Sequence, residues 1–249
     1  MLGIAVTLKN DSGHYGTIPW FAAVEEADTV VAAALRTPPH NLVVSAGPSP
    51  AMEILVADAV KATAPLTGVS GKKDSSHALA SAWSRISGRP FRLKAADRIH
   101  KLVAVSTVPQ ATGRIRELAD GEISLYCSWL SQFMNEAGVL TDLRDIGKLA
   151  KARIAFHQAW VWDDGGPVSM ASWGRETRNT GCIYGVYTPP DQRGRGYATS
   201  LVAGLSRHLL STGKAGCVLF TDLANPVSNS IYAKIGYTPV CDFNEYGFE

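Results

Sequence analysis

Residues that commonly hold metal ions or form redox pairs are few and scattered in this sequence. The four cysteines, Cys127, Cys182, Cys217 and Cys241, lie far apart and include no CxxC pair. The six histidines form neither an HExxH pattern nor another pair at ligand spacing. We therefore expect no metal site and a reducing, cytoplasmic setting. Cys182 and Cys217 lie in apolar, strand-like runs, which predicts buried thiols.

Long apolar runs and a strong net charge are also missing. No apolar stretch approaches the roughly 20 residues that a membrane-spanning helix needs. The first residues, MLGIAVTLKNDSG, carry no positive charge before their short apolar patch, so a signal peptide is not expected. A net charge of +2 over 249 residues is too small to predict nucleic acid or an anionic membrane as a partner. A hydrophobic content of 46% instead predicts a globular protein with an ample core.

The signatures of kinases, dehydrogenases and one class of hydrolase are missing as well. The glycine-rich segment 191–199 does not match G-x-x-x-x-G-K-[ST], because no lysine follows its glycines. It also fails the dinucleotide pattern G-x-G-x-x-G, since Thr199 stands where the third glycine belongs. No G-x-S-x-G elbow occurs in the chain. A kinase or a dehydrogenase is therefore only a distant alternative.

The most informative stretch that is present covers residues 184–206, YGVYTPPDQRGRGYATSLVAGLS. It begins as an apolar strand, stops at two prolines, passes through a charged glycine-rich turn and opens into an amphipathic helix. Backbone N–H groups in the first turn of a helix have no partner within the helix, and the helix dipole favours an anion there. Arg193 and Arg195 add positive charge beside the same amides. The stretch therefore predicts a phosphate-bearing ligand at residues 193–199.

A second motif lies in residues 217–237, CVLFTDLANPVSNSIYAKIGY. An apolar strand is followed by a helix that Asn225 can cap, with proline at its first position and glycine after its end. At 100° per residue, Asn225, Asn229 and Tyr232 share one face of this helix. Taken alone, the pattern leaves two interpretations open, an ordinary capped helix or a surface that faces a ligand.

Both motifs resemble those of the GCN5-related N-acetyltransferases. The turn has the spacing R-x-x-G-x-A of that family's pyrophosphate loop, with Arg193, Gly196 and Ala198 at the fixed positions. The second motif, N-x-x-x-N-x-x-Y-x-x-x-G-[YF], is similar to the family's fourth helix. The resemblance covers roughly residues 113–249. It implies acetyl-CoA as cosubstrate and direct transfer of an acetyl group to an amine.

The resemblance also implies roles for individual residues. The cofactor-binding set comprises Val186, Tyr187 and Thr188 along the pantetheine arm, Arg193, Gly194, Arg195, Gly196, Tyr197, Ala198 and Thr199 around the pyrophosphate, and Asn225 and Asn229. Tyr232 is expected to protonate the departing thiolate, and Asn225 to orient the pantetheine or the attacking amine. An amine with a pKa near 10 is only about one part in a thousand neutral at pH 7, so a base or water must take its proton. Candidate bases are Glu117, Glu176 and Asp222.

The chain is expected to form two parts, residues 1–112 and 113–249. In the first, residues 20–24 and 29–35 predict paired strands, residues 51–63 a helix, residues 98–106 a strand and residues 107–113 a linker. In the second, residues 157–162 and 168–173 predict a hairpin, and Thr141 is expected to cap a helix. The fold class is α/β (α+β), a mixed, mostly antiparallel sheet flanked by helices. The first part resembles the degenerate, motif-free N-terminal lobe of two-lobed bacterial members of the family.

Two features of the first part leave alternatives open. Residues 71–76, GKKDSS, precede a predicted helix, as a second phosphate loop would, but one glycine and two lysines are equally ordinary on a surface. A basic run is broken only by Asp97 and contains Arg85, Arg89, Arg92, Lys94, Arg98 and Lys101. These residues are either solvated positions or a surface for an acidic partner or for the 3′-phosphate of the cofactor.

The leading hypothesis is an acetyl-CoA-dependent N-acetyltransferase that acts on a small amine, as a monomer or homodimer. A protein or peptide N-acetyltransferase is the close alternative, favoured by an open groove over a walled pocket. A CoA-binding module without turnover is a third hypothesis. Tyr232 and Asn225 argue against that module, because binding alone needs the glycine-rich turn but not the tyrosine.

Overall fold

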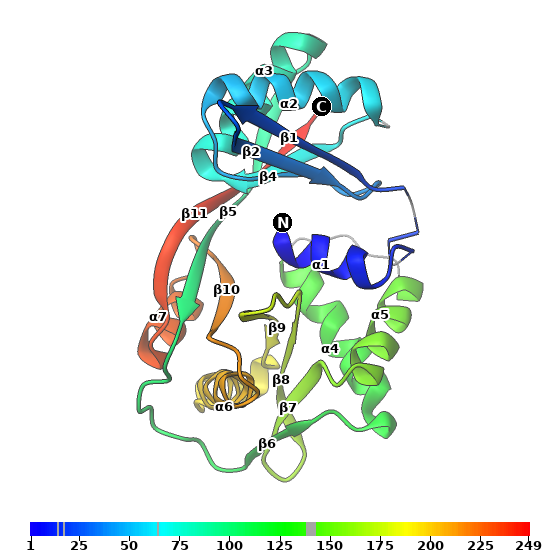
Figure 1. Cartoon of the computed structure of the whole chain (residues 1–249). Helices are drawn as coiled ribbons and strands as arrows, with labels where there is room; N and C mark the ends of the chain where they lie inside the picture. Colours follow the sequence, from blue (N-terminus) through cyan, green and yellow to red (C-terminus); the bar gives the residue numbers. More distant parts are fainter. Residues whose placement is uncertain (14, 17, 64, 138–142) are drawn as a thin grey trace. The chain divides into compact units, whose positions relative to one another are not determined.

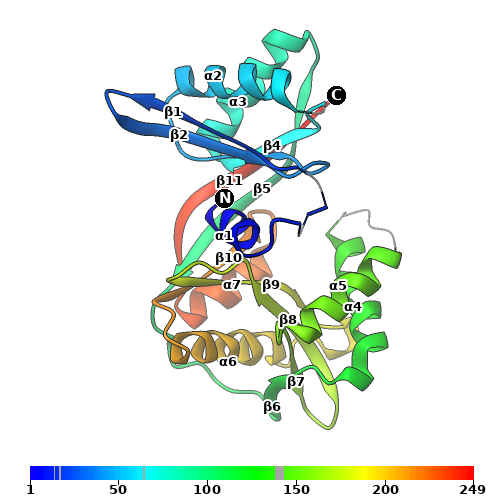
Figure 2. The same cartoon turned by 45° about the vertical axis from the view of Figure 1, so that its right-hand side comes forward.

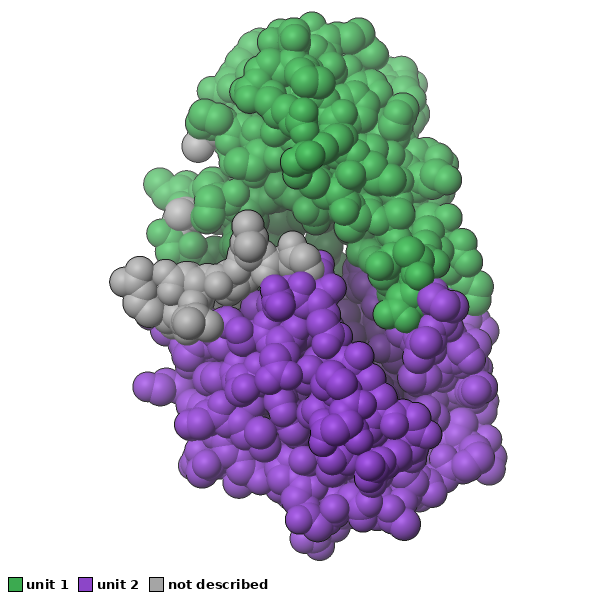
Figure 3. Space-filling view, turned by 180° about the vertical axis from the view of Figure 1, so that it is seen from behind, with its two compact units in different colours: residues 1–99, 221–225, 239–249 green, residues 100–220, 226–238 purple. Residues whose placement is uncertain are grey.

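The computed structural model describes residues 1–13, 15, 16, 18–63, 65–137 and 143–249, so the predicted cap at Thr141 lies outside the described residues. The chain divides into two compact units, which Figure 3 colours separately. Unit 1 comprises Met1–Ile99, Thr221–Asn225 and Pro239–Glu249, and unit 2 comprises His100–Phe220 and Pro226–Thr238. Strands β5 (Phe91–Leu102), β10 (Gly216–Asp222) and β11 (Thr238–Phe248) contribute residues to both.

Unit 1 contains a mixed sheet. Its other elements are α1 (Leu2–Asn10), β1 (Trp20–Glu26), β2 (Thr29–Arg36), β3 (Leu42–Val44), α2 (Ser49–Ala62), β4 (Gly68–Lys72) and α3 (Lys73–Ser87). The strand order is β1-β2-β3-β4-β11-β5. The β1–β2, β2–β3 and β4–β11 pairs are antiparallel, and the β3–β4 pair is parallel. The predicted strand pair at residues 20–35 is therefore confirmed.

The core of unit 1 lies between its sheet and two helices. Helices α2 and α3 run side by side over strands β1 to β4 (Figures 1 and 2). Leu55 and Val56 of α2 and Leu79 of α3 are buried against Val44 and Val69 of the sheet. Burial of such side chains contributes about 1.5–3 kcal/mol each, which explains why both helices are amphipathic.

Unit 2 contains the glycine-rich turn and the second motif except for its residues 221–225, which belong to unit 1. Its elements are β6 (Arg114–Glu117), η1 (Asp120–Glu122), α4 (Ile123–Glu136), α5 (Leu143–Ala155), β7 (Ala159–Asp163), β8 (Pro167–Gly174), β9 (Thr180–Tyr187), η2 (Pro190–Gln192), α6 (Tyr197–Ser211) and α7 (Pro226–Ile235). The strand order is β10-β9-β8-β7-β6. The β6–β7, β7–β8 and β8–β9 pairs are antiparallel and the β9–β10 pair is parallel.

Alternation along β7 shows how the sheet of unit 2 separates two cores. Trp160 and Trp162 pack into a cluster with helix α6, whereas Ala159 and Val161 face a second cluster with α4 and α5. Successive side chains of a strand point to opposite faces, so one strand serves both cores. Helix α6 therefore covers one face, and α4 and α5 cover the other (Figure 1).

The expected fold class, a mixed and mostly antiparallel sheet flanked by helices, is confirmed. Cys182 and Cys217 are buried as predicted, and burial raises the pKa of each thiol to about 11. Within the described ranges, no helix is long and apolar enough to cross a bilayer. Strand β5 starts at Phe91, earlier than the strand predicted from residue 98, and its first four residues alternate apolar and charged side chains, as a strand with one exposed face does.

Candidate active site

Strands β9 and β10 pair for only part of their lengths. Their parallel register runs from the pair Thr180 and Gly216 to the pair Ile183 and Leu219 and then ends. β9 nevertheless continues to Tyr187, where it still pairs with Met170 of β8. The edge of β9 that faces away from β8 therefore lacks a strand partner in its last residues. An extended chemical group can hydrogen-bond to such an edge.

A bulge accompanies the loss of pairing. Tyr184 pairs with Ser172 and Tyr187 with Met170, so Gly185 and Val186 lie opposite one residue of β8. Gly185 has φ +63°, a left-handed conformation that a glycine adopts without strain. Bulges of this kind bend a strand and increase its twist. The bulge thus lies just after the last residue of β9 that pairs with β10.

The glycine-rich turn leads from this strand end into helix α6. Gly194 and Gly196 have φ +79° and +80°, and Gly196 directly precedes the helix. In the described part of the chain, Ser200 is the first residue of this helix start whose amide has a backbone acceptor, the Gly196 carbonyl oxygen at 3.0 Å. The amides at residues 197–199 therefore remain available to a ligand, as expected at a helix N-terminus.

The side chain of Arg193 turns away from these amides. Its guanidinium forms a two-pronged contact with Glu136 at the end of α4, at 2.8 and 2.9 Å, and donates to the Thr188 carbonyl oxygen at 2.9 Å. Arg195 donates to the Asp191 carbonyl oxygen at 3.2 Å. Arg193 thus ties the turn to α4 and to the end of β9.

The start of α6 is also fixed from the other side. The Tyr197 hydroxyl donates to Asp164 at 2.6 Å, and Thr112 donates to the same carboxylate at 2.7 Å. These two hydroxyls hold the pKa of Asp164 below its ordinary value. The Ala111 amide donates to the Ser200 hydroxyl at 2.8 Å. Ala111 and Thr112 of the predicted linker 107–113 therefore help to fix the start of α6. The buried Tyr197 side chain has the same role through Asp164.

Tyr232 projects from α7 into the core beside α6. Only 7% of its surface is exposed, and its ring meets that of Tyr237 edge-on at 6.0 Å. Burial alone raises the pKa of its hydroxyl to about 12, so the group stays protonated through the neutral range. Among the described residues no hydrogen-bond partner is found for this hydroxyl. Its oxygen is not one of the fully buried atoms that lack a partner in the described part of the chain, so it reaches solvent and is open to a ligand.

Comparisons with known proteins agree with this geometry. Residues 163–246, about a third of the chain, match the family model described as FR47-like protein. A search of curated proteins finds no match. Among solved structures, the chain is similar to GCN5-related N-acetyltransferases from two organisms. A GCN5-related N-acetyltransferase from Kribbella flavida has 14% identity, a TM-score of 0.59 and coverage of 99% of this chain and 95% of that one. One from Sphaerobacter thermophilus has 15% identity, a TM-score of 0.60 and coverage of 88% and 76%.

The resemblance to the GCN5-related N-acetyltransferases (GNAT) is confirmed, and the chain has their fold. A GNAT-family acetyltransferase from Colwellia psychrerythraea is a third similar structure, with 10% identity, a TM-score of 0.60 and coverage of 92% of this chain and 84% of that one. These neighbours show a fold that the chain shares with N-acetyltransferases.

The GNAT fold separates two of the candidate bases from the end of β9. Glu117 lies on β6, three strands from β9, a distance of roughly 14 Å at 4.8 Å per strand. It contacts the His157 ring at 2.7 Å. Glu176 precedes the start of β9 and pairs with Lys214 at 2.7 Å, about 20 Å of strand away from Val186. Neither carboxylate can reach an amine beside Val186.

The two asparagines of the GNAT-like helix motif lie at the start of α7. Asn225 directly precedes Pro226 and belongs to the segment that unit 1 contributes, whereas Asn229 lies within α7 in unit 2, three residues before Tyr232. Asp222, the third candidate base, also belongs to unit 1, where it accepts a hydrogen bond from the Ala224 amide at 2.8 Å. The roles predicted for the asparagines remain predictions.

The second phosphate loop considered at residues 71–76 has a structural explanation. A Cβ added to Gly71 would lie 2.6 Å from a Val44 side-chain carbon and 2.9 Å from the Val44 carbonyl oxygen. This glycine therefore permits the close pairing of β3 and β4. Its φ is not in the left-handed range, unlike those of Gly194 and Gly196.

Three of the six residues in the basic run form ion pairs. Arg85 pairs with Glu53, Arg92 with Glu249 and Arg98 with Asp242. Each pair offsets the charge of its arginine and so lowers the positive charge open to an acidic partner. This favours the interpretation of the run as ordinary solvated positions.

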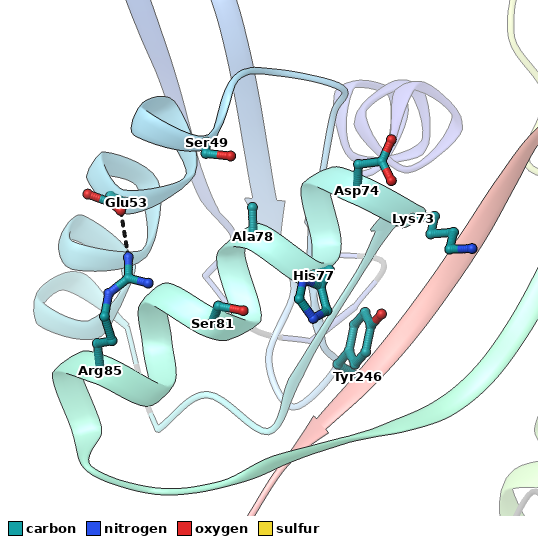
Figure 4. A pocket seen from close by; sticks show the side chains of 9 residues that line it. All are labelled: Ser49, Glu53, Lys73, Asp74, His77, Ala78, Ser81, Arg85 and Tyr246. Atoms are coloured by element: carbon teal, nitrogen blue, oxygen red, sulfur yellow. Dashed lines mark hydrogen bonds and ion pairs between the residues drawn. The ribbon is translucent and has the colours of Figure 1, made fainter.

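Unit 1 also contains a cavity of about 480 Å³ between α2 and α3 (Figure 4). The Arg85–Glu53 pair crosses one end, and His77 lies beside Tyr246 at the other, with ring centroids 5.7 Å apart. None of the predicted cofactor-binding residues lines this cavity. It has neither the open strand edge nor the glycine turn of unit 2.

Several residues of unit 2 with evident structural roles at the site escaped the sequence analysis. Glu136 holds the turn through Arg193, and Arg153 lies over the bulge of β9. A lone Glu at the end of a helix and a lone Arg near the end of another carry no recognisable pattern. Only the pairing of distant segments in space reveals them.

Proposed function

We propose that this chain is an acetyl-CoA-dependent N-acetyltransferase that transfers an acetyl group to the primary amine of a small molecule. The observation that carries the proposal is the continuity of three features: the unpaired end of β9, the turn with two left-handed glycines and the open start of α6. The unpaired end of β9 suits a ligand arm that carries amide groups, and the turn and the start of α6 suit a pyrophosphate. Neither a kinase loop nor a dinucleotide loop requires an unpaired strand end before it.

The residues of the turn fit a phosphate ligand by their shape. A Cβ added to Gly194 would meet no atom within 4 Å, so the space beside this backbone is open. Left-handed glycines direct successive amides toward one side, where they form an anion-binding concavity. In this proposal the amides of residues 194–199 bind the pyrophosphate, with Arg195 adding charge at the rim. Arg193 contributes by holding the turn in place through Glu136.

Acetyl-CoA supplies the acetyl thioester, and the residues of the chain orient and polarise it. The backbone of Val186, Tyr187 and Thr188 binds the pantetheine amides along the free edge of β9. The Val186 amide donates to the thioester oxygen, on which negative charge develops as the amine attacks. Tyr232 donates its proton to the departing sulfur, and Asn225 and Asn229 orient the arm or the amine. We propose that water accepts the proton of the amine, because Glu117 and Glu176 are too distant.

The enclosure of β9 favours a small acceptor over a protein side chain. On the side of the sheet toward α4 and α5, the buried residues include Tyr187 of β9, Ser172 of β8 and Tyr126 of α4. An acceptor that approaches along this face must fit between side chains that are already packed. We propose one active site for the chain, within residues 113–249, and a first part that binds no cofactor.

Thermal unfolding with separate additions of acetyl-CoA, CoA, NAD and ATP tests the proposal. A ligand at 100 times its Kd stabilises the folded protein by about 2.7 kcal/mol. We expect stabilisation by acetyl-CoA and CoA only, with one site by calorimetric titration, followed by thiol release when a panel of small amines is added. Stabilisation by NAD or ATP instead would contradict the assignment of the turn. Binding of acetyl-CoA without turnover of any amine or peptide would identify a binding module.

A further inference from the structure

Arg153, in the last turn of α5, is a buried cation without an acidic partner. Only 9% of its surface is exposed, and its Nε atom has no hydrogen-bond partner. Among the described residues, no carboxylate forms an ion pair with it. Burial of an unpaired charge is costly, and arginines at such depth are normally paired. The favourable field at a helix C-terminus is a weaker effect and does not remove that cost.

Within the described residues, the Arg153 guanidinium makes one hydrogen bond, to a pair of buried hydroxyls. Arginine can only donate, so its Nη1 atom donates to the Tyr126 hydroxyl at 3.0 Å. The Tyr126 and Ser172 hydroxyl oxygens lie 2.6 Å apart, and either hydroxyl can be the donor. Whichever hydroxyl donates, the Nε–H of Arg153 has no acceptor among the described residues. All three side chains are buried, so this cluster has donors in excess of acceptors.

A second cation increases the imbalance. The ring of Tyr184 has the Arg153 guanidinium 4.8 Å from its centroid and that of Arg175 at 5.4 Å. Arg175 has φ +45°, an uncommon conformation for a residue with a side chain. The structure pairs neither guanidinium with a carboxylate in the part of the chain that it describes. The buried Arg153 and the exposed Arg175 thus flank the half-buried ring of Tyr184, and two cations without a carboxylate partner favour an anion there.

The cluster lies at the bulge of β9. A Cβ added to Gly185 would be 3.8 Å from Arg153 Nη1 and 3.8 Å from the Ser172 hydroxyl oxygen. The absence of a side chain at Gly185 therefore leaves the backbone of the bulge uncovered beside these donors. Gly185 is adjacent to Val186, about 3.8 Å away by Cα spacing. An anion held by Arg153 would thus lie one residue from the amide proposed to polarise the thioester.

We propose that Arg153 binds a carboxylate of the acceptor, so that the substrate is an amino acid rather than a simple amine. This inference rests on the proposed function. The nitrogen of the neutral amine forms a bond to the acetyl carbon, and the carbon–sulfur bond breaks. The sulfur leaves as a thiolate and takes one proton, while the amine nitrogen loses one, giving an N-acetyl amino acid and CoA. Arg153, with Ser172 beside it, fixes the carboxylate and so the position of the amine.

Matched acceptors test this inference with the unmodified chain. Alanine, glutamate, phenylalanine and β-alanine would each be compared with the corresponding primary amide, in which the carboxylate is neutralised, by release of CoA. Loss of a buried, hydrogen-bonded charge pair predicts a kcat/KM roughly 100-fold higher for at least one acid than for its amide. Equal values for acids and amides would overturn the inference while leaving the acetyltransferase assignment intact.

Variants assign the preference to Arg153. Arg153→Gln should raise KM for the acid about 100-fold, with kcat and the amide reaction little changed. Arg178→Gln, which removes an exposed arginine from the connection between β8 and β9, is the control and should change neither reaction. A loss shared equally by acid and amide in Arg153→Gln would show a structural role and contradict the inference. Stabilisation by acetyl-CoA shows that each variant is folded.

A binding measurement separates this inference from the proposed function. Propionate, but not propionamide, should further stabilise the wild-type chain in the presence of CoA, and Arg153→Gln should abolish that effect. If no amine were acetylated at all, the proposed function would fail, yet the propionate effect would still report on Arg153. Equal effects of propionate and propionamide, or none from either, would overturn the assignment of an anion site.

Discussion

A pair of glycine substitutions separates binding by the turn from its contribution to folding. Gly194, before α6, and Gly213, after it, have φ +79° and +89°, and a Cβ at either would meet no atom within 4 Å. The folding cost of Gly194→Ala and of Gly213→Ala is therefore only that of a left-handed backbone, about 1–2 kcal/mol each. For a chain of this size that lowers Tm by about 2–8 °C. Without ligand the two variants should be equally destabilised.

With acetyl-CoA the two variants should differ. Relaxation of the backbone at Gly194 away from left-handed φ turns its neighbouring amides out of the concavity. One lost hydrogen bond to a charged group weakens binding by about 1.5–3 kcal/mol, or roughly 10- to 150-fold in Kd. Gly213→Ala leaves the helix start unchanged and should retain the wild-type Kd. Calorimetric titration of acetyl-CoA measures both values.

The reasoning would be refuted by equal Kd values for the two variants. Such a result would mean that the conformation of the turn does not position a ligand, and residues 193–199 would be an ordinary connection. A larger loss of ligand-free stability in Gly194→Ala than in Gly213→Ala would point to a structural role for the turn, and the change in Kd would then have to be corrected for the unfolded fraction.

Two further predictions follow from the side chains around the site. Tyr232→Phe removes the only donor of that residue and should lower kcat about 100-fold, with an unchanged Kd for acetyl-CoA by titration; retained kcat would contradict its role as the acid. Arg116 contacts Glu122 and Asp163 at 2.6 Å each and holds the pKa of both carboxyls below its ordinary value. The contacts therefore stabilise the fold above about pH 4.5 and are lost as pH falls through the lowered pKa values. The stability difference between wild type and Arg116→Gln should be largest near pH 7 and shrink in acid, and a difference that grew in acid would contradict this sign.

The features that could be predicted from the sequence are those that adjacent residues determine. The order of strand, proline stop, glycine turn and helix at residues 184–206 is local, because each step depends on the residues that adopt it. The same holds for the strand pair at residues 20–35, whose turn has Ala27 and Asp28 at positive φ. Local chemistry specified these elements, and the structure contains them with small shifts in their ends.

Pairings between distant segments could not be predicted in this way. Strand β11 lies against β4, with Phe243 opposite Lys72 and Gly247 opposite Gly68. Nothing in a C-terminal strand identifies its partner, because any exposed strand edge offers the same backbone groups. Helix α1 was not predicted either. It buries only Leu8 and so has too few apolar positions to produce a clear helical period.

The basic character of the glycine turn was predicted, but the direction of its side chains was not. Charge near a helix start suggested that Arg193 and Arg195 both face the ligand. The structure instead engages Arg193 with Glu136 and with the Thr188 carbonyl oxygen. A side chain as long as arginine can reach several partners, and only the position of α4 decides among them. The role of Arg193 is therefore to position the turn.

If Arg193 positions the turn, the loss of Glu136 should change the affinity for acetyl-CoA in the direction opposite to the one expected from charge alone. Glu136→Gln removes a negative charge close to an anionic ligand, which by charge alone should tighten binding of acetyl-CoA. If Glu136 instead holds the turn through Arg193, its loss should weaken binding, because the turn is no longer tied to α4. Asp191→Asn provides the control, since Asp191 lies in the same turn, and the one contact found for its carboxylate is with the neighbouring Gln192 side chain.

We expect Asp191→Asn to bind acetyl-CoA slightly more tightly and Glu136→Gln to bind it less tightly, by a few-fold for an exposed pair worth up to about 1 kcal/mol. Calorimetric titration at low ionic strength would measure both. Arg193→Gln and the double variant complete a cycle, in which the two changes should not add if they remove one shared contact. Tighter binding by Glu136→Gln would mean that charge outweighs position. Arg193 would then have to contact the phosphates directly once the ligand is bound, as its place in the sequence motif first suggested.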